Sequence, residues 1–450
     1  MTKMFGTNGV RGVVNQDMNV QLALQMGKAI GAVNPGVTAI ATDTRYTCDM
    51  LKMAVSAGLM SVGCDVIDLR SLPTPALQYY VRTHGVVGGV MITASHNPPQ
   101  FNGIKVIAND GTEASPELEE AIENKYDEDI APVNWKETGH SSKYLGAADE
   151  YVDAIISKLD VDAIREANLT VVLDCTNGAA YYTSPLLLRR LGVRAITLNG
   201  NPQGEFPGHP SEPTEDNLQD LIKMVKATGA CLGIAHDGDA DRCVFIDGEG
   251  NYVPGDKTLA ILARSIVKEN GGGIVVTPVA TSSVIDETVG AVGGTVERTA
   301  VGSPKVARRM IDNGGVFGGE ENGGLIFADH QFCRDGGMAI GRMLESIIKI
   351  GPLKEQVDSL VPFYTVKKKL VCPNELKEPL LKFLEERTAD LRRDLTDGLK
   401  LLFPNGWVLA RASGTEPIFR VYAESREQAI AEELASKYEA MVKEYLSSFE

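Results

Sequence analysis

Short apolar runs alternate with longer amphipathic stretches along most of this chain. Three sets of run, stretch and run occur: residues 37–42, 49–63 and 65–69; residues 169–173, 185–191 and 195–198; and residues 273–277, 282–289 and 295–299. Short apolar runs predict strands, and apolar residues spaced three and four positions apart predict helices. This alternation, with its glycine-rich turns, predicts α/β units with mixed or parallel sheets.

A weak repeat runs through the same pattern. Residues 88–105, 230–246 and 314–327 each read as a glycine-rich strand, a polar loop and a second apolar strand. The repeat is one of pattern rather than identity, and it predicts three similar α/β units.

The pattern changes at two places along the chain. A charged stretch at 113–125, followed by a predicted helix at 149–159, places a first domain boundary near residue 148. Toward the end, a small α+β unit is predicted, with strands at 366–370, 407–410 and 418–424 and helices at 375–392 and 427–447.

Composition and charge narrow the class of protein. The 450 residues carry a net charge of −16, which argues against nucleic acid and anionic membranes as partners, so an anionic substrate would need local basic residues. The seven cysteines are scattered and form no C-x-x-C pair, which favours buried free thiols in a reducing compartment. With no apolar leader and no long apolar run, we expect a cytoplasmic protein, and the oligomeric state stays open, a dimer included.

The first candidate for chemistry is the serine loop, residues 93–98, which lies between the apolar runs 86–92 and 104–108. A serine hydroxyl becomes a useful nucleophile only beside a base or with strong electrostatic help. Ser95 lacks the G-x-S-x-G setting, and its neighbour His96 would normally point away, so a hydrolase triad is not indicated. Taken alone, the loop is equally well a rigid turn that joins two strands.

The aspartate loop, residues 237–242, offers a set of metal ligands. Asp237, Asp239 and Asp241 are spaced so that an extended, solvent-facing loop can aim all three carboxylates at one hard divalent cation. An EF-hand is excluded, because its sixth and twelfth positions are occupied by Arg242 and Gly248. Mutual repulsion favours a bound cation over a solvated acidic turn, and Mg²⁺ keeps positions open for phosphate oxygens.

Two further loops suit a phosphorylated sugar. In the glutamate loop, residues 319–324, Glu320 and Asn322 lie among glycines that let a ligand approach, although a polar hairpin tip would look alike. The arginine loop, residues 411–420, contains hydrogen-bond donors that suit a phosphate dianion. The alternative interpretation of this loop is a surface turn. Its donor residues are Arg411, Ser413, Gly414, Thr415 and Arg420. No Walker A sequence occurs, which disfavours ATP hydrolysis.

Two more arginines lie in or beside short turn-like segments. Arg11 lies in residues 5–12, and Arg45 follows Asp43. Either guanidinium could neutralise a phosphate in transfer.

With these four loops in this order, the chain resembles the α-D-phosphohexomutase family over essentially its full length. The resemblance implies that Ser95 is phosphorylated in the resting enzyme and that the three aspartates, with Ser95, hold one Mg²⁺. It also implies three similar α/β domains and a C-terminal α+β domain around a central cleft. The expected domains are residues 1–148, 149–251, 252–362 and 363–450.

The resemblance also implies a reaction, in which a phosphoryl group moves between O6 and O1 of a hexose. Phosphoserine 95 gives its group to the substrate, a hexose 1,6-bisphosphate turns around, and Ser95 takes the other phosphate back. The arginine loop holds the phosphate that is not reacting.

Further residues enter through the same resemblance. Lys105 matches a family lysine that takes part in proton transfer at the sugar hydroxyl. To act as a general base, it would need a lowered pKa, which Arg11 and the metal could supply. Arg11 resembles an N-terminal catalytic arginine, and we add His96 to the catalytic set. The remaining substrate-binding candidates are Arg242, Thr299, Gly302 and Lys305.

Two departures from the family pattern concern the glutamate loop and the substrate. Many members end this loop in Ser-Gly-His, where this chain has Asn322-Gly323-Gly324, and whether His330 replaces the missing histidine is open. Residues 5–12 resemble phosphoglucosamine mutases, which predicts glucosamine phosphate and leaves mannose, glucose and pentose phosphates as alternatives. A phosphosugar phosphatase and a non-catalytic sugar-phosphate sensor are the rival functions.

Overall fold

The computed structural model describes residues 4–6, 8–414 and 416–449. The chain forms two compact units, each of which is described by itself. Unit 1 comprises Met1–Thr258 and Asn322–Asp358, and unit 2 comprises Leu259–Glu321 and Ser359–Glu450. Among the described residues, no helix is long and apolar enough to cross a membrane.

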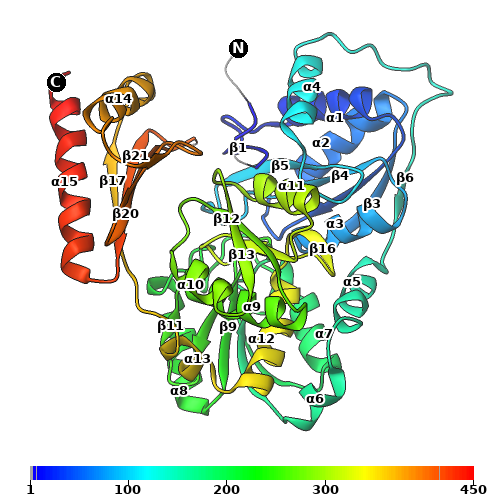
Figure 1. Cartoon of the computed structure of the whole chain (residues 1–450). Coiled ribbons are helices and arrows are strands. Elements are labelled where there is room, and N and C mark those ends of the chain that lie inside the picture. Colours follow the sequence, from blue (N-terminus) through cyan, green and yellow to red (C-terminus); the bar gives the residue numbers. More distant parts are fainter. Residues whose placement is uncertain (1–3, 7, 415, 450) are drawn as a thin grey trace. The chain divides into compact units, whose positions relative to one another are not determined.

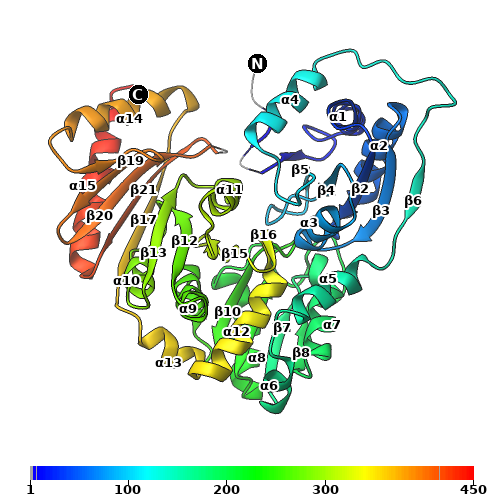
Figure 2. The ribbon, with the colours of Figure 1, turned by 45° about the vertical axis from the view of Figure 1, so that its right-hand side comes forward.

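The first sheet of unit 1 has six strands, in which β2 is parallel to β3 and β4, and β4 is antiparallel to β5. In order across the sheet they are β1 (Val10–Val13), β5 (Phe101–Ile107), β4 (Gly88–Ile92), β2 (Val37–Thr42), β3 (Asp65–Ser71) and β6 (Ser141–Lys143). Helices α1 (Val20–Val33) and α2 (Cys48–Ser61) lie on one face and α3 (Thr74–Thr83) on the other (Figure 2).

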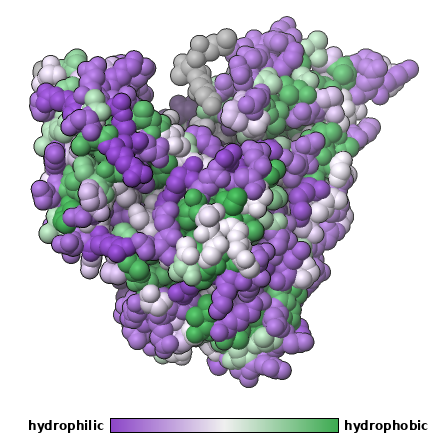
Figure 3. Space-filling view, in the orientation of Figure 1, coloured by the Kyte–Doolittle hydropathy of each residue, from purple (hydrophilic) through white to green (hydrophobic). Residues whose placement is uncertain are grey.

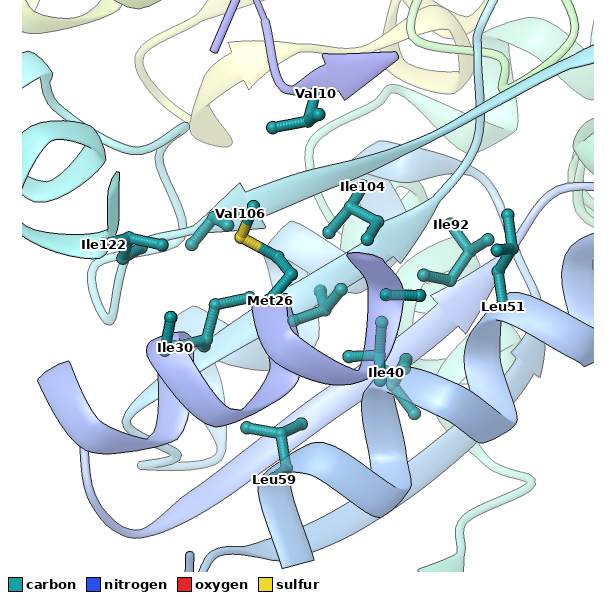
Figure 4. Packing of buried hydrophobic residues seen from close by; sticks show 14 of the residues in the cluster. Val10, Met26, Ile30, Ile40, Leu51, Leu59, Ile92, Ile104, Val106 and Ile122 are labelled. Atoms are coloured by element: carbon teal, nitrogen blue, oxygen red, sulfur yellow. The ribbon is translucent and has the colours of Figure 1, made fainter. Parts of the chain in front are cut away.

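The regularly spaced apolar residues of these helices and strands pack into one hydrophobic core. Met26 and Ile30 of α1 and Leu51 and Leu59 of α2 pack against the inward-facing residues of the central strands (Figure 4). Helix α4 (Pro116–Tyr126) turns Ile122 into this core, while its outward surface is largely hydrophilic (Figure 3). Burying these side chains contributes roughly 1.5–3 kcal/mol each, which fixes the sheet that carries the serine loop.

The second sheet of unit 1 repeats the first. Its order is β11 (Tyr252–Val253), β10 (Cys243–Asp247), β9 (Leu232–His236), β7 (Thr170–Asp174) and β8 (Arg194–Leu198). Strand β7 is parallel to β8 and β9, and β9 is antiparallel to β10, so β9–β10 corresponds to β4–β5. The serine loop and the aspartate loop therefore occupy equivalent turns, as the sequence repeat predicts.

Helices complete unit 1 around these sheets. They are α5 (Ala147–Ile156), α6 (Val161–Glu166), α7 (Thr183–Arg190), α8 (Gln219–Thr228), α12 (Gly336–Ile350) and α13 (Leu353–Asp358), with 3₁₀ turns at Ala179–Tyr181 and Asp216–Leu218. Strands β15 (Leu325–Phe327) and β16 (Gln331–Arg334) form an antiparallel pair before α12.

Unit 2 begins with a parallel arrangement in which β12 (Gly273–Pro278) lies between β13 (Gly294–Thr299) and β14 (Phe317–Gly319). Its helices are α9 (Gly255–Glu269), α10 (Val284–Gly290) and α11 (Ser303–Asn313). Strands β13, β12 and β14 correspond to β3, β2 and β4 of unit 1, so the third copy of the repeat keeps the same parallel centre.

The C-terminal α+β unit contains an antiparallel sheet with two strands more than the three that the sequence predicts. Its order is β17 (Tyr364–Val371), β21 (Ile418–Ser425), β20 (Gly406–Ala412), β19 (Leu399–Phe403) and β18 (Arg393–Asp394). Helices α14 (Asn374–Arg387) and α15 (Gln428–Ser447) cover one face (Figure 1). On the other face, Trp407, Leu409 and Tyr422 pack against Val279 and Ala280.

The cysteines behave as expected from their apolar contexts. All seven are free, and all except the half-buried Cys231 are buried.

Candidate active site

Ser95 lies in the turn between β4 and β5, in a buried and uncommon backbone conformation. It is 1% exposed, and its φ of +50° is left-handed, which few residues other than glycine adopt. Its N–H donates to Thr93 Oγ1 at 2.8 Å, and its hydroxyl donates to Asp237 Oδ2 at 2.8 Å. The hydroxyl is therefore aimed at the aspartate loop from a fixed turn.

Arg45 holds this turn in place. Its guanidinium pairs with Asp43 at 3.0 Å and donates to four backbone carbonyl oxygens at 2.6–3.0 Å, those of Ser95, Asn97, Pro98 and Phe101. Of the two arginines that could neutralise a transferring phosphate, Arg45 uses its buried guanidinium donors within the serine loop itself.

Asp237, Asp239 and Asp241 converge, as their spacing predicts. One carboxylate oxygen from each lies within 4.8 Å of the others, and Ala240 takes a φ of +57° to make the turn. The loop is not solvent-facing as expected: the three residues are at most 1% exposed, because the turn is enclosed by unit 1.

In two of these carboxylates one oxygen is hydrogen-bonded and the other is not. Asp239 Oδ2 accepts from Thr74 Oγ1 at 2.5 Å and from Lys105 Nζ at 2.6 Å, and Asp241 Oδ2 accepts from Lys105 Nζ at 3.1 Å. The Oδ1 atoms of Asp239 and Asp241 are buried and have no hydrogen-bond partner. Open, buried carboxylate oxygens are what a hard divalent cation requires, so these residues fit Mg²⁺.

The charges of this cluster are strongly coupled. Burial, followed by the neighbouring Asp241 and Asp239, raises the pKa of Asp237 well above its usual range. Burial would also raise the pKa of Asp239, but Lys105 outweighs it and lowers that pKa. Burial would lower the pKa of Lys105, yet Asp239 and Asp241 raise it above its ordinary value, contrary to the lowered pKa expected for a base.

Three further predicted residues lie around Ser95. Arg11 donates to Asn97 Oδ1 at 2.8 Å, and Arg242 pairs with Glu212 at 3.1 Å. His96 does not point away as expected, since its Nδ1 lies 3.4 Å from Ser95 Oγ. Burial, with Arg242 and Arg11, lowers the pKa of His96 to about 2, so its imidazole is neutral.

The predicted residues of the glutamate loop are divided between the two units. In unit 2, Glu320 is buried, and its Oε1 accepts from the Gly302 N–H at 3.2 Å, so these two residues are brought together. Thr299 donates to its neighbouring carbonyl, and Lys305 is exposed on α11. In unit 1, Asn322 Oδ1 accepts from the Gly324 N–H at 3.1 Å.

The arginine loop begins in β20 and ends in β21. Arg411 and Arg420 are cross-strand partners, and the Nε of each is buried without a hydrogen-bond partner. Ser413 is buried, Gly414 is exposed, and Thr415 lies outside the described residues. Two aligned guanidinium groups with donors to spare suit a phosphate dianion.

Some residues of the site carry no local signal in the sequence. Asp397 pairs with Arg411 at 3.0 Å and accepts from the Val301 N–H at 2.9 Å, so it connects the arginine loop to the segment before Gly302. Thr74 and Arg334 reach the aspartates from 165 and 93 residues away in sequence. Only the folded chain shows such pairings.

His330, the candidate replacement for the missing histidine of the glutamate loop, is 3% exposed. Its Nε2 lies 3.2 Å from Asp335 Oδ2, and its ring stacks on Tyr79. Asp335 also accepts from Tyr151 Oη at 2.5 Å and caps α12. His330 therefore belongs to a cluster with Asp335, Tyr79 and Tyr151.

Comparison with known proteins gives one consistent family. Sequence models of phosphoglucomutase/phosphomannomutase match in four consecutive parts: alpha/beta/alpha domain I at residues 2–132, domain II at 149–250, domain III at 254–364 and the C-terminal domain at 369–440.

Individual relatives are similar to this chain over nearly their full lengths. A phosphoglucomutase/phosphomannomutase of Thermococcus kodakarensis is 42% identical over 96% of this chain and 97% of its own. A probable phosphoglucosamine mutase of Methanopyrus kandleri is 42% identical over 98% of each. A crystal structure of a phosphoglucomutase/phosphomannomutase family protein from Burkholderia thailandensis is 25% identical, covers 98% of this chain and 97% of its own, and superposes with a TM-score of 0.87.

Proposed function

Because the chain belongs to the phosphoglucomutase/phosphomannomutase family, we propose that it is a phosphohexomutase acting on glucosamine phosphate. It interconverts hexose 6-phosphate and hexose 1-phosphate. The observation that carries this proposal is the Ser95 hydroxyl, held 2.8 Å from Asp237 within a buried aspartate cluster.

In the proposed cycle, Ser95 carries the phosphoryl group. A sugar hydroxyl loses its proton as its oxygen bonds to phosphorus, and the bond from phosphorus to Ser95 Oγ breaks. Ser95 Oγ takes up a proton, which gives a hexose 1,6-bisphosphate and a free serine hydroxyl. The bisphosphate turns around, and Ser95 takes the other group. His96, within the serine loop, and Arg11, which donates to the Ala94 carbonyl oxygen of that loop, are the other two proposed catalytic residues.

Lys105 is the proposed proton-exchange group at the sugar hydroxyl. Asp239 and Asp241 raise its pKa and keep it protonated in the described arrangement. Its acidity therefore depends on those carboxylates being engaged elsewhere. Asp237, Asp239 and Asp241 are the proposed ligands of one Mg²⁺, which would neutralise charge on the phosphoryl group of Ser95.

The remaining residues are proposed to bind the sugar and its second phosphate. Glu320 and Asn322 are proposed to accept from sugar hydroxyls. Thr299, Gly302 and Lys305 are further proposed substrate-binding residues, and Arg242 is proposed to bind the transferring phosphate. Arg411, Ser413, Gly414, Thr415 and Arg420 hold the phosphate that is not reacting.

Glucosamine phosphate is the proposed sugar on two grounds. Residues 5–12 resemble phosphoglucosamine mutases, and a full-length relative at 42% identity carries that name. A second relative of equal identity is named for glucose and mannose phosphates, so the choice requires a direct test. We further propose a cytoplasmic location, which suits seven free thiols.

The test is a panel of hexose 6-phosphates followed by ³¹P NMR, with catalytic hexose 1,6-bisphosphate. We expect glucosamine 6-phosphate to give the 1-phosphate with the highest kcat/KM, and intact mass to show one phosphate on the wild type and none on Ser95→Ala. Ser95→Ala should lose about 10³-fold or more in kcat. Accumulation of inorganic phosphate would support a phosphatase instead, and full activity in Ser95→Ala would exclude the phosphoserine cycle.

A further inference from the structure

Arg334, at the end of β16, is a buried cation that the proposed cycle leaves without a role. The residue is 6% exposed, and its guanidinium donates to Asp241 Oδ2 at 2.6 Å and lies 3.5 Å from Glu113 Oε1. Glu113 in turn accepts from the side-chain amide of Asn8. Arg334 thus connects the aspartate loop to the N-terminal segment.

The contact with Asp241 is selective for one carboxylate oxygen. Arg334 and Lys105 both donate to Oδ2, whereas the buried Oδ1 has no hydrogen-bond partner and has only the more distant Arg242 Nε, 3.9 Å away, as a charged neighbour. Fixing one oxygen sets the rotation of the carboxylate and so determines where the other points. Asp239 is arranged in the same way by Thr74 and Lys105.

The geometry points to Arg334 as a positioning residue of the aspartate centre, which orients Asp241 so that its Oδ1 is presented to a divalent cation. This inference rests on the proposed function, because it requires the three aspartates to bind metal. A lysine would serve less well, since a planar guanidinium can reach two carboxylates in fixed directions whereas an ammonium is a point charge.

Gly324 provides the space that Arg334 occupies. A Cβ atom built on Gly324 would lie 2.3 Å from Arg334 Cδ and 3.0 Å from its Cγ. The φ of Gly324 is not left-handed, unlike the φ of +90° at Gly323, so the backbone itself tolerates a side chain there. The closest atoms that a side chain here would meet are those of Arg334, with Asn322 Oδ1 next at 3.2 Å.

The pair accounts for the departure at the end of the glutamate loop. Position 324 is where the Ser-Gly-His pattern would put its histidine, and any such side chain would collide with Arg334. A histidine at position 324 is therefore incompatible with the position that the Arg334 side chain takes here. Gly324 and Arg334 thus form a coupled pair in this chain.

The test is direct metal binding by the full-length protein, with free Mn²⁺ measured by electron paramagnetic resonance as a probe of the Mg²⁺ site. Arg334→Met should raise the Kd for Mn²⁺ about 10–100-fold, and Arg334→Lys should raise it less. Gly324→Ala should also raise the Kd, because its Cβ displaces the arginine. In the Arg334→Met background, however, Gly324→Ala should add nothing.

Controls separate positioning from folding and from the proposed function. Arg342→Met is the matched variant, since Arg342 pairs with Asp329 and Glu345 outside the site and should leave the Kd unchanged. Thermal unfolding without metal checks that each variant folds. An unchanged Kd in a folded Arg334→Met protein would overturn the inference, and additive effects of the two substitutions would overturn the coupling. If the wild type itself binds no Mn²⁺, the metal centre fails, and this inference fails with it.

Discussion

A single buried arginine, Arg45, holds the loop that carries Ser95, the proposed catalytic serine. Arg45 supplies donors to four carbonyl oxygens around Ser95 and neutralises Asp43, so its removal leaves a buried carboxylate unpaired. We expect Arg45→Met to lower the free energy of unfolding by about 3–5 kcal/mol. Urea unfolding followed by circular dichroism measures this change.

The matched control for Arg45 is Arg165, whose side chain is 56% exposed. Arg165→Met should change the free energy of unfolding by less than about 0.5 kcal/mol. A comparably small change in Arg45→Met would contradict the role of Arg45 as the residue that holds the serine loop.

A second residue-scale contact makes stability depend on pH. His209 Nε2 lies 3.3 Å from Asp174 Oδ2, and its Nδ1 lies 2.7 Å from the Pro210 carbonyl oxygen, so both nitrogens face acceptors. Burial would lower the pKa of His209, but Asp174 raises it overall. Burial would raise the pKa of Asp174, but His209 and hydrogen bonds lower it overall.

The signs of these shifts define a pH window. The contribution of His209 is complete below its unfolded pKa of about 6.5 and is lost as the pH rises through its raised folded pKa. The contribution of Asp174 is present above about 3.9 and is lost as the pH falls through its lowered folded pKa. The stability lost in His209→Gln should therefore be larger at pH 5.5 than at pH 9 in urea unfolding. His140→Gln, at an exposed histidine, should show no such difference, and a loss for His209→Gln that is independent of pH would refute the ion pair.

At the scale of elements, the serine loop and the aspartate loop are packed backbone to backbone. A Cβ atom on Gly238 would lie 2.4 Å from the Ser95 carbonyl oxygen, although the φ of Gly238 is not left-handed. Gly238→Ala should separate the two loops by about 1 Å and reduce kcat roughly 10²-fold. Steady-state kinetics of the mutase reaction measures this loss.

Gly290 offers the comparison for Gly238. A Cβ atom there meets nothing within 4 Å, and the φ of Gly290 is not left-handed. Gly290→Ala should keep wild-type kcat, whereas wild-type kcat in Gly238→Ala would show that the close approach of the loops is not required.

The elements themselves were predictable where packing follows local pattern. The strands on either side of the serine and aspartate loops lie where the apolar runs indicate, because each is buried in its own sheet. The helix predicted at 375–392 ends instead at Arg387, where Thr388 Oγ1 donates to the Leu384 carbonyl and closes the last turn. The following residues form β18 and β19, since Leu399 and Leu401 complete the C-terminal core.

At the scale of the whole molecule, the candidate site was predictable as motifs but not as contacts. Ser95, the aspartates and the arginines could be recognised from the sequence, because the chemically relevant residues of each loop lie within a few positions of one another. Thr74, Arg334 and Asp397 could not be recognised, since their partners are far away in sequence. The same holds for the burial of the aspartate loop, which depends on neighbouring modules of unit 1 rather than on its own polar sequence.

The location of the aspartate centre predicts which part of the molecule a metal stabilises. Ser95 and all three aspartates belong to unit 1. Trp407 belongs to unit 2, where its buried indole N–H donates to Glu424. Mg²⁺ at about 100 times its Kd should add about 2.7 kcal/mol to the stability of unit 1. In a Trp135→Phe background, which leaves Trp407 as the only tryptophan, circular dichroism should show a transition that moves to higher temperature with Mg²⁺.

The fluorescence of Trp407 should report a second transition that Mg²⁺ leaves in place, because unit 2 contains none of the proposed metal ligands. EDTA should abolish the shift seen by circular dichroism, and Asp241→Asn should reduce it. A Trp407 transition that moves with Mg²⁺ as far as the circular dichroism signal would mean that the two units unfold as one cooperative block, contrary to this prediction.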